Sequence, residues 1–447
     1  MWEDWIYFML FDTVLRNVKI VNMKGEYNIG INEGKISKIS KTGLNGENVI
    51  SPGEGEVVLP GLIDPHVHFR DPGLTYKEDF HTGSMSAANG GFTTVIDMPN
   101  TKPITNTYKN FHEKIKIGEK KSIVNFGLNS GFNTYGEMCK IAELKPASFK
   151  IFMDLETDSS LNEKFKDLQR LNTELGTSFL VSCHCENRFI VHENTYYQKS
   201  KKENQSIDYS YARPSEAEIV SIKQVLDLIR KYDLKAHICH LSTVKGLKEV
   251  LKSPCDVSYE FTPHHIYLDN TYFNSLGNMV KTNPPLRNVN DKIGLKNINP
   301  KCMIGTDHAP HTINEKNLGV WDSKPGIGNL ECVLPLLLTE VNNGSLSLGL
   351  LAKIMSENPA KRFHLENKGE ICEGYDADIT IVNLKESGVI NPMEFYSKAK
   401  YSPFKNWTYT GKPVMTIVNG EVIMEKGEIL KRDIDRKGEK ISKYVHS

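Results

Sequence analysis

The sequence predicts an α/β protein in which a (β/α)8 barrel of the TIM type carries a smaller, discontinuous β-domain built from both chain ends. Eight apolar runs, helix-like stretches between most of them and β-rich chain ends support this prediction. The runs span residues 57–63, 92–97, 123–128, 148–153, 178–184, 235–240, 256–261 and 301–306. Continuous apolar runs are typical of parallel strands that are buried on both faces. A doubly wound open sheet is the alternative.

Amphipathic stretches between the apolar runs predict helices over residues 75–89, 161–175 and 214–231. Pro214 suits the first turn of the last of these helices, because the missing N–H has no helical partner there. Strands that alternate with helices and end in polar residues favour the barrel, whose functional side chains gather at the carboxyl ends of its strands.

Both chain ends have the alternating pattern and glycine-rich turns of short β-strands. We therefore expect residues 9–56 and 366–435 to form one small β-domain, and residues 57–365 to form the barrel. Two independent β-appendages are the alternative to a single discontinuous domain.

Composition indicates a globular protein without an obvious polyanionic partner. The 447 residues include 55 Lys+Arg and 55 Asp+Glu, so we expect neither nucleic acid nor a membrane as a partner. The eight scattered cysteines are typical of reduced thiols, which favours a cytoplasmic location. The apolar N-terminus carries Glu3 and Asp4 where a signal peptide carries basic residues, and Met9 is an alternative start to Met1.

The first candidate site follows the first apolar run, in the segment DPHVHFRDPG. His66 and His68 are two residues apart, so on an extended strand their imidazoles point to the same side. Arg70 would project to that side as well. Two ordinary histidines at a strand end are the simpler interpretation of such a pair, and it weakens as further candidate ligands appear downstream.

Further polar residues stand in or after later runs. His184 ends the fifth run, His240 ends the sixth, Asp307 follows the eighth, and Lys150 lies within the fourth. Imidazole and carboxylate groups are ligands that Zn²⁺ accepts. Each histidine alone could be a buried structural residue, Asp307 could cap a turn, and the CxC pair Cys183–Cys185 offers thiolates instead. On a strand, however, these thiols would point away from His184.

Substrate recognition is predicted for the polar residues around this cluster. Arg70 offers a planar fork that suits a carboxylate. Asn100, in MPNT, and His311, in GTDHAPH, are the other candidates for the same group. The stiff NPPLR loop begins at Asn283 and could read an amide edge.

Several motifs together resemble those of dihydroorotases in the amidohydrolase superfamily, in particular the larger class that includes the dihydroorotase domain of the animal multifunctional pyrimidine enzyme. The resemblance covers about Met9 to Leu430. The motifs, in order, are DPHVHFRDPG, GGFTTVIDMPNT, FKIFM, CHCEN, HICHLS, PHH, NPPLR, GTDHAPH and PGIGNLE. The distance between HVHFRDPG and GTDHAPH makes the match specific.

The resemblance implies two zinc ions per chain. His66, His68 and Asp307 would bind one ion, His184 and His240 would bind the other, and Lys150, carboxylated by CO₂, would bridge them. In some relatives an aspartate bridges instead, and Asp154 and Asp158 are the nearby candidates.

The family's substrate ligands map onto residues already singled out. Arg70, Asn100 and His311 match the carboxylate ligands, and Asn283 matches a pyrimidine-ring contact. Asp71 stands where many relatives have Glu. The loop DLETDSS matches a mobile loop, but its length differs, which leaves the role of Thr157 in doubt.

The implied reaction is the reversible cyclisation of N-carbamoyl-L-aspartate to L-dihydroorotate in pyrimidine (UMP) biosynthesis. A zinc-activated hydroxide would be the nucleophile and Asp307 the general base and acid. Another cyclic amidase, such as an allantoinase or hydantoinase, is the near alternative, and a non-catalytic partner of aspartate transcarbamoylase is the distant one. We expect a small-molecule substrate, with self-association or binding to aspartate transcarbamoylase left open.

Overall fold

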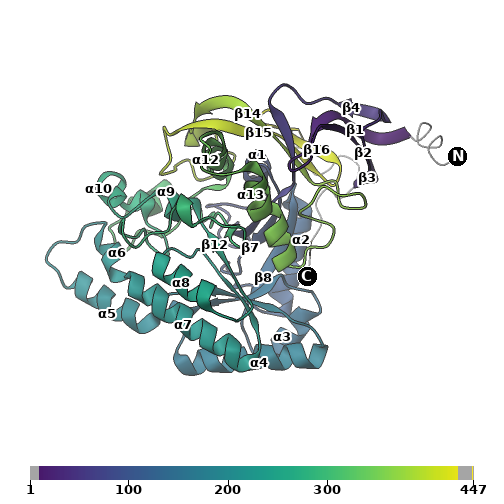
Figure 1. Ribbon diagram of the computed structural model, residues 1–447. Helices are drawn as coiled ribbons and strands as arrows, with labels where there is room; N and C mark the ends of the chain where they lie inside the picture. Colours follow the sequence, from purple (N-terminus) through teal and green to yellow (C-terminus); the bar gives the residue numbers. More distant parts are fainter. Residues whose placement is uncertain (1–9, 431–444, 446–447) are drawn as a thin grey trace.

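Eight parallel strands form the barrel in the computed structural model, which describes residues 10–430 and residue 445 (Figure 1). The strands are β6 (Leu62–Val67), β7 (Phe92–Asp97), β8 (Asn125–Gly131), β9 (Ser148–Phe152), β10 (Leu180–His184), β11 (Lys235–Ile238), β12 (Val257–Phe261) and β13 (Met303–Ile304). Each pairs with its neighbour in chain order. Beyond the end of β13, Val67 pairs in parallel with His308, and this contact closes the barrel. The predicted fold class is confirmed, and the alternative prediction of a doubly wound open sheet is wrong.

Helices surround the barrel strands (Figure 1). They are α1 (Phe80–Asn89), α2 (Tyr108–Lys121), α3 (Tyr135–Ala142), α4 (Asp158–Leu175), α5 (Arg188–Lys199), α6 (Asp208–Ala212), α7 (Ser215–Tyr232), α8 (Val244–Lys252), α9 (Pro263–Tyr267), α10 (Tyr272–Leu276), α11 (Ile313–Lys316), α12 (Leu330–Asn342), α13 (Leu348–Ala352) and α14 (Asn358–Arg362). The three helices predicted from periodicity correspond to α1, α4 and α7. Helix α1 begins five residues later than predicted, because Asp79 caps it by accepting from Thr82 N.

The two chain ends lie together and form two further sheets (Figure 1). The four-stranded sheet contains β1 (Leu10–Lys19), β2 (Glu26–Asn32), β3 (Lys35–Ser40) and β4 (Asn45–Ile50). The five-stranded sheet contains β5 (Glu56–Pro60), β14 (Ile379–Val389), β15 (Thr408–Val418), β16 (Glu421–Glu425) and β17 (Glu428–Ile429).

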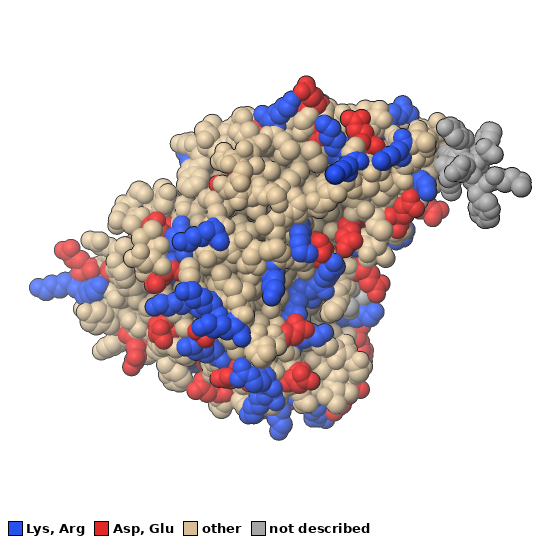
Figure 2. All heavy atoms as spheres, viewed as in Figure 1, with Lys and Arg blue, Asp and Glu red and all other residues tan. Residues whose placement is uncertain are grey.

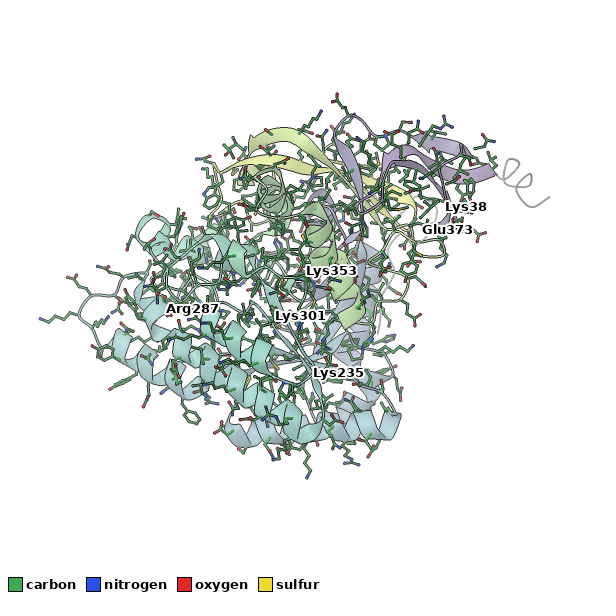
Figure 3. The ribbon with its side chains drawn as sticks, viewed as in Figure 1. Lys38, Lys235, Arg287, Lys301, Lys353 and Glu373 are labelled. Atoms are coloured by element: carbon green, nitrogen blue, oxygen red, sulfur yellow. The ribbon has the colours of Figure 1, made fainter. Side chains whose placement is uncertain are left out.

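One apolar core joins these end sheets, with Leu15 and Ile29 from one and Ile379 and Ile417 from the other. Lys38 and Glu373 lie side by side at their edge (Figure 3), with Nζ and Oε1 3.4 Å apart.

One predicted barrel run is divided in the structure. Residues 57–63 were expected to form a single strand, but β5 pairs with β14 in the end sheet and only β6 belongs to the barrel. Gly61 lies between the two strands, where a side chain would collide with Thr93. The proposed domain boundaries at 56/57 and 365/366 stay predictions. The candidate starts Met1 and Met9 and the segment 431–435 lie outside the described residues.

Positive and negative side chains are interspersed on the face seen in Figure 2, without a large area of one sign. Within residues 10–430 and at residue 445, no helix has the length and hydropathy needed to cross a bilayer. All eight cysteines lie among the described residues, and all carry free thiols.

Candidate metal-dependent active site

A single cavity of about 620 Å³ opens at the carboxyl ends of the barrel strands. All ten residues predicted for the site line it: His66, His68, Arg70, Asn100, Lys150, His184, His240, Asn283, Asp307 and His311. They come from seven barrel strands or the segments that follow them, so only the closed barrel brings them together. Their individual roles stay predictions.

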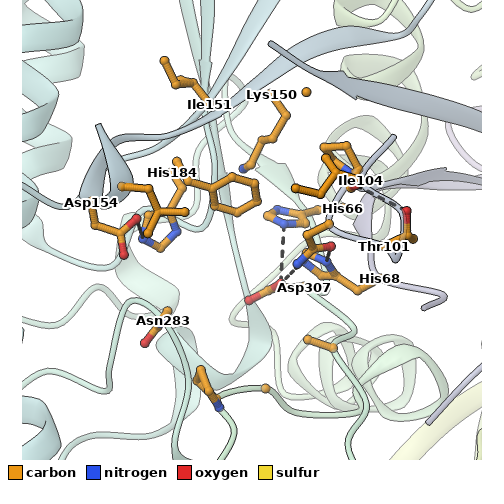
Figure 4. A pocket seen from close by; sticks show the side chains of 18 of the residues that line it. His66, His68, Thr101, Ile104, Lys150, Ile151, Asp154, His184, Asn283 and Asp307 are labelled. Carbon is orange, nitrogen blue, oxygen red and sulfur yellow. Dashed lines mark hydrogen bonds and ion pairs between the residues drawn. The ribbon is translucent and has the colours of Figure 1, made fainter. Parts of the chain in front are cut away.

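Asp307 lies between the first two imidazoles (Figure 4). Its Oδ1 is 3.4 Å from His66 Nε2 and 3.1 Å from His68 Nε2. The other ring nitrogens have different acceptors, because His66 Nδ1 meets Glu260 Oε1 and His68 Nδ1 lies 2.7 Å from Asn100 Oδ1. Both rings therefore turn Nε2 towards Asp307.

The protonation of these groups is set by burial and by their neighbours. Burial alone would lower the pKa of His66, but the Glu260 and Asp307 carboxylates raise it to about 10. For His68 the effect of burial outweighs the contact with Asp307, so its pKa falls to about 4. Burial would raise the pKa of Asp307, yet the two imidazoles hold it below its ordinary value. Asp307 is therefore an ionised acceptor.

The second pair of imidazoles lies beside the first, with the ring centres of His240 and His66 5.2 Å apart. His184 Nδ1 and His240 Nε2 are 3.0 Å apart. The far nitrogen of His184 meets Glu186 Oε2 at 2.8 Å. His240 Nδ1 is buried and has no hydrogen-bond partner among the described residues. Burial, followed by the neighbouring His184 and His66, lowers the pKa of His240 well below its ordinary value.

These donors fit a site for cations. His66, His68 and Asp307 bring three ligand atoms within 4.8 Å of one another. When His184 Nδ1 and His240 Nε2, which are 3.0 Å apart, both present lone pairs, these lone pairs repel each other unless they bind a cation. Imidazole and carboxylate donors match the preferences of Zn²⁺.

Lys150 reaches the cavity from β9 with only 2% of its surface exposed (Figure 4). Its Nζ donates to Cys239 Sγ at 2.8 Å and lies 5.1 Å from the ring centre of Phe152. Of the two alternative bridging aspartates, Asp154 also lines the cavity, but Arg213 Nη2 already binds its Oδ2 at 2.6 Å. Asp158 lies instead at the start of α4 on the exposed surface, where its Oδ1 accepts a hydrogen bond from Gln224 Nε2 at 2.8 Å.

A cationic corner lies beside Asp307. Arg70 Nη2 is 3.1 Å from His311 Nε2, and its Nε donates to Pro310 O at 3.2 Å. Lys77 Nζ lies 3.1 Å from His311 Nδ1 and 2.8 Å from Glu315 Oε1. Burial, then the charges of Arg70 and Lys77, lowers the pKa of His311 far below its ordinary value. Arg70 and Lys77 flank a neutral imidazole, and Glu315 pairs with Lys77, so the guanidinium of Arg70 is the charge that makes this corner attractive to an anion.

Asn283 also lines the cavity and lies below Asp154 and His184 in the view of Figure 4. Its Oδ1 accepts from Tyr209 OH at 2.6 Å, which fixes the direction of the amide. The NH₂ group of Asn283 is therefore the part that remains for a ligand.

Buried carboxylates hold the backbone of the site. Asp64 accepts from Thr306 N at 3.0 Å and from its hydroxyl at 2.5 Å, which ties β6 to β13. Asp97 accepts from Phe69 N at 2.7 Å.

The backbone is strained at three residues of the site. Arg70, His240 and Asp307 have positive φ values of 62°, 36° and 48°, a region that such residues rarely adopt. The surrounding contacts hold this strained backbone in place.

Comparison with known proteins identifies the family. Residues 57–423 match the Amidohydrolase family, which is more than half of the chain. This chain belongs to the amidohydrolase family. The resemblance predicted from the sequence motifs is confirmed.

Sequence relatives and solved structures similar to this amidohydrolase carry specific names. The chain is 48% identical over 421 residues to the dihydroorotase of Methanothermobacter thermautotrophicus, covering 94% of this chain and 96% of the relative. It is 46% identical to the dihydroorotase of Methanosphaera stadtmanae, covering 97% and 99%. Among solved structures, the L-hydantoinase (dihydropyrimidinase) from Arthrobacter aurescens superposes with a TM-score of 0.89 at 30% identity, covering 98% and 100%.

Sequence reasoning missed the residues that support the amidohydrolase site from behind. Glu260 contacts His66, Glu186 contacts His184, and Lys77 contacts His311. Glu186 stands two residues after His184 in CHCEN, so its proximity could have been inferred from local spacing. No local signal points to Glu260, which lies 194 positions from His66 in sequence.

Two sequence alternatives find no support in the geometry. Cys183 and Cys185 lie in the apolar layer outside the barrel, and burial raises the pKa of both thiols above their ordinary value. Thr157 caps α4 by accepting from Ser160 N at 3.3 Å, and it is not among the residues that line the cavity. Leu155 and Glu156 line the cavity in its place.

Proposed function

We propose that the protein is a zinc-dependent dihydroorotase, which interconverts N-carbamoyl-L-aspartate and L-dihydroorotate plus water in de novo pyrimidine biosynthesis. One observation carries the proposal: a buried cationic corner stands beside the Asp307 and imidazole cluster, in a chain 48% identical to a dihydroorotase. L-Dihydroorotate has both features that such a cavity would recognise, a cyclic amide and a carboxylate.

Two groups of side chains would hold the metal. His66, His68 and Asp307 form one, His184 and His240 form the other, and Lys150, carboxylated by CO₂ on Nζ, would bridge them. Bound zinc would polarise the ring carbonyl and lower the pKa of water, so that hydroxide is available at neutral pH. The buried position of Lys150 between the two groups supports the bridging role.

Asp307 is the proposed general base and acid. Its lowered pKa keeps it ionised, as needed to accept a proton from water in the hydrolytic direction. The same oxygen would return that proton to the ring nitrogen as the amide bond breaks. In the cyclising direction the order of transfers reverses.

The cationic corner is the proposed carboxylate site. Arg70 supplies the charge, His311 and Asn100 supply further polar contacts, and together they would fix the orientation of the ring. Asn100 has a second task, since its Oδ1 accepts from His68 Nδ1 at 2.7 Å and leaves Nε2 of that ring free to bind. Asn283 would contact the pyrimidine ring with its NH₂ group.

A hydantoinase-type cyclic amidase is the second candidate, because the fold is also that of an L-hydantoinase at 30% identity. Hydantoin has no carboxylate, and within the described residues Arg70 forms no ion pair, so its charge would have no partner in a complex with hydantoin. The cytoplasmic location, self-association and association with aspartate transcarbamoylase remain predictions.

Turnover of dihydroorotate, hydantoin and allantoin by the purified, zinc-loaded protein tests the proposal. We expect dihydroorotate to be the preferred substrate by a wide margin, and faster hydrolysis of hydantoin would overturn the assignment.

Arg70→Met tests the carboxylate site. It should lower kcat/KM for dihydroorotate by about 1,000-fold, since losing one partner of a buried charge pair costs about 2–5 kcal/mol. Uncharged dihydrouracil should be affected far less. Lys102→Met is the matched control, because Lys102 is an exposed cation on the same cavity wall. Equal losses for both substrates would contradict the role of Arg70.

A further inference from the structure

A buried ion-pair network lies behind His184, and its central residues, Arg213 and Glu186, were not predicted from the sequence to bind metal or substrate. The guanidinium of Arg213 contacts both oxygens of Glu186, with Nε at 3.1 and 3.0 Å and Nη2 at 2.6 Å. The same Nη2 also donates to Asp154 Oδ2 at 2.6 Å. Glu186 Oε2 in turn meets His184 Nε2 at 2.8 Å. One arginine thus joins two carboxylates and, through one of them, an imidazole of the site.

This network fixes the tautomer of His184. Glu186 is fully buried, and the guanidinium of Arg213 contacts both of its oxygens, so the ionised carboxylate is the form that this ion pair stabilises. An ionised carboxylate only accepts hydrogen bonds, so His184 Nε2 must carry the proton. The lone pair of the ring is then on Nδ1, the nitrogen that faces His240 at 3.0 Å.

The partners of Arg213 come from two neighbouring strand ends. Asp154 lies in the 3₁₀ turn η2 (Met153–Leu155), four residues after Lys150, and Glu186 lies two residues after the end of β10. Arg213 itself follows α6, and its carbonyl accepts from Arg287 Nη1 at 2.5 Å. Arg287 belongs to the NPPLR loop (Figure 3). Arg287 therefore anchors the backbone of Arg213, while the guanidinium of Arg213 spans the ends of β9 and β10.

We propose that Arg213 is a positioning residue that orients His184 through Glu186 and holds the turn after Lys150 through Asp154. This inference rests on the metal site proposed above. The fork of an arginine is needed, because a lysine offers one compact ammonium that cannot reach both carboxylates in the same geometry. Asp154 gives one oxygen, Oδ2, to Arg213, and its Oδ1 lies 3.8 Å from the protonated Nε2 of His184.

Zinc binding is the direct test. The protein would be loaded with zinc and dialysed against a competing chelator, and the zinc retained per chain would be measured for wild type, Arg213→Lys, Arg213→Met and Glu186→Ala. Arg170→Met is the matched control, since Arg170 pairs with Glu174 at 2.8 Å on the exposed surface of α4. Cobalt-loaded samples add a visible absorption spectrum that reports the ligand geometry.

The three test variants should hold one of the two ions about 10–100-fold more weakly, because loss of a partner that orients a ligand has an effect of this size. Their cobalt spectra should change, and the control should match wild type. Glu186→Gln should lose less affinity than Glu186→Ala, because its carbonyl oxygen still accepts from His184. Unfolding of the metal-free protein would be followed in parallel, and Arg213→Lys serves as the test if Arg213→Met does not fold.

Two results would overturn the inference: wild-type zinc affinity with an unchanged cobalt spectrum in Arg213→Lys, or an equal loss of both ions in every test variant, which would indicate general support of the fold. Failure of the proposed function looks different. In that case the wild-type protein itself would bind no zinc or would not turn over dihydroorotate.

Discussion

Glu331 should make the stability of this protein fall between pH 5 and pH 8. Its side chain is buried near the start of α12, where Oε2 accepts from Asn89 Nδ2 at 2.7 Å and Oε1 accepts from Ser397 N at 3.1 Å. Within the described residues no cation lies within ion-pair distance of it. Burial therefore raises the pKa of Glu331 from 4.5 to about 7.

The sign and size of the effect follow from proton binding. The unfolded chain releases the proton near pH 4.5, whereas the folded protein keeps it until about pH 7. The native state binds more protons in this interval, so the free energy of unfolding decreases as pH rises through it. A difference of about 2.5 pKa units corresponds to about 3 kcal/mol, lost in full above pH 7.

Glu331→Gln removes the ionisation and keeps the shape. The glutamine oxygen can accept from Ser397 N, and Asn89 can turn its amide so that its oxygen accepts from the new NH₂ group. We expect the variant and wild type to differ by less than about 1 kcal/mol at pH 5, and the variant to be more stable by about 3 kcal/mol at pH 8.

Urea unfolding at pH 5, 6, 7 and 8 measures this difference. Glu163→Gln is the control, because Glu163 is exposed on α4 and its substitution should leave the pH dependence unchanged. A difference between Glu331→Gln and wild type that stays constant across this pH range would refute the reasoning.

Three other substitutions test the site and its surroundings. Asp307→Asn should lower kcat by at least about 100-fold while zinc analysis finds most of the metal retained; activity near wild type would exclude Asp307 as the general base. Lys77→Met should raise KM for dihydroorotate about 10-fold with little change in kcat, because the ammonium of Lys77 lies 3.1 Å from His311 in the carboxylate site. Steady-state kinetics of the variant and of wild type measure both constants. Lys316→Met leaves three backbone carbonyls without their buried donor, so it should lower the free energy of unfolding by about 3 kcal/mol. Urea unfolding measures this loss, and an unchanged midpoint would show that water replaces the ammonium.

The residues of the candidate site could be predicted because the barrel places the carboxyl ends of its strands together. His184 is the last residue of β10, and Asp307 follows β13 by three positions, so a correct strand assignment is enough to bring them to one face. The division of residues 57–63 between two sheets could not be predicted. Both halves are apolar, and their separation depends on pairing with β14, more than 300 positions away.

The sequence by itself determined the barrel, the β-rich ends and the ten side chains of the cavity, because strand periodicity and the residues at strand ends are local properties. Tertiary structure alone decided what stands behind those side chains. Glu260 reaches His66 across 194 positions, and Lys77 reaches His311 across 234. The proton on each imidazole and the charge of each carboxylate depend on such contacts. These contacts form only when distant segments of the chain pack together. Burial then strengthens the electrostatic interactions between the groups that have been brought together.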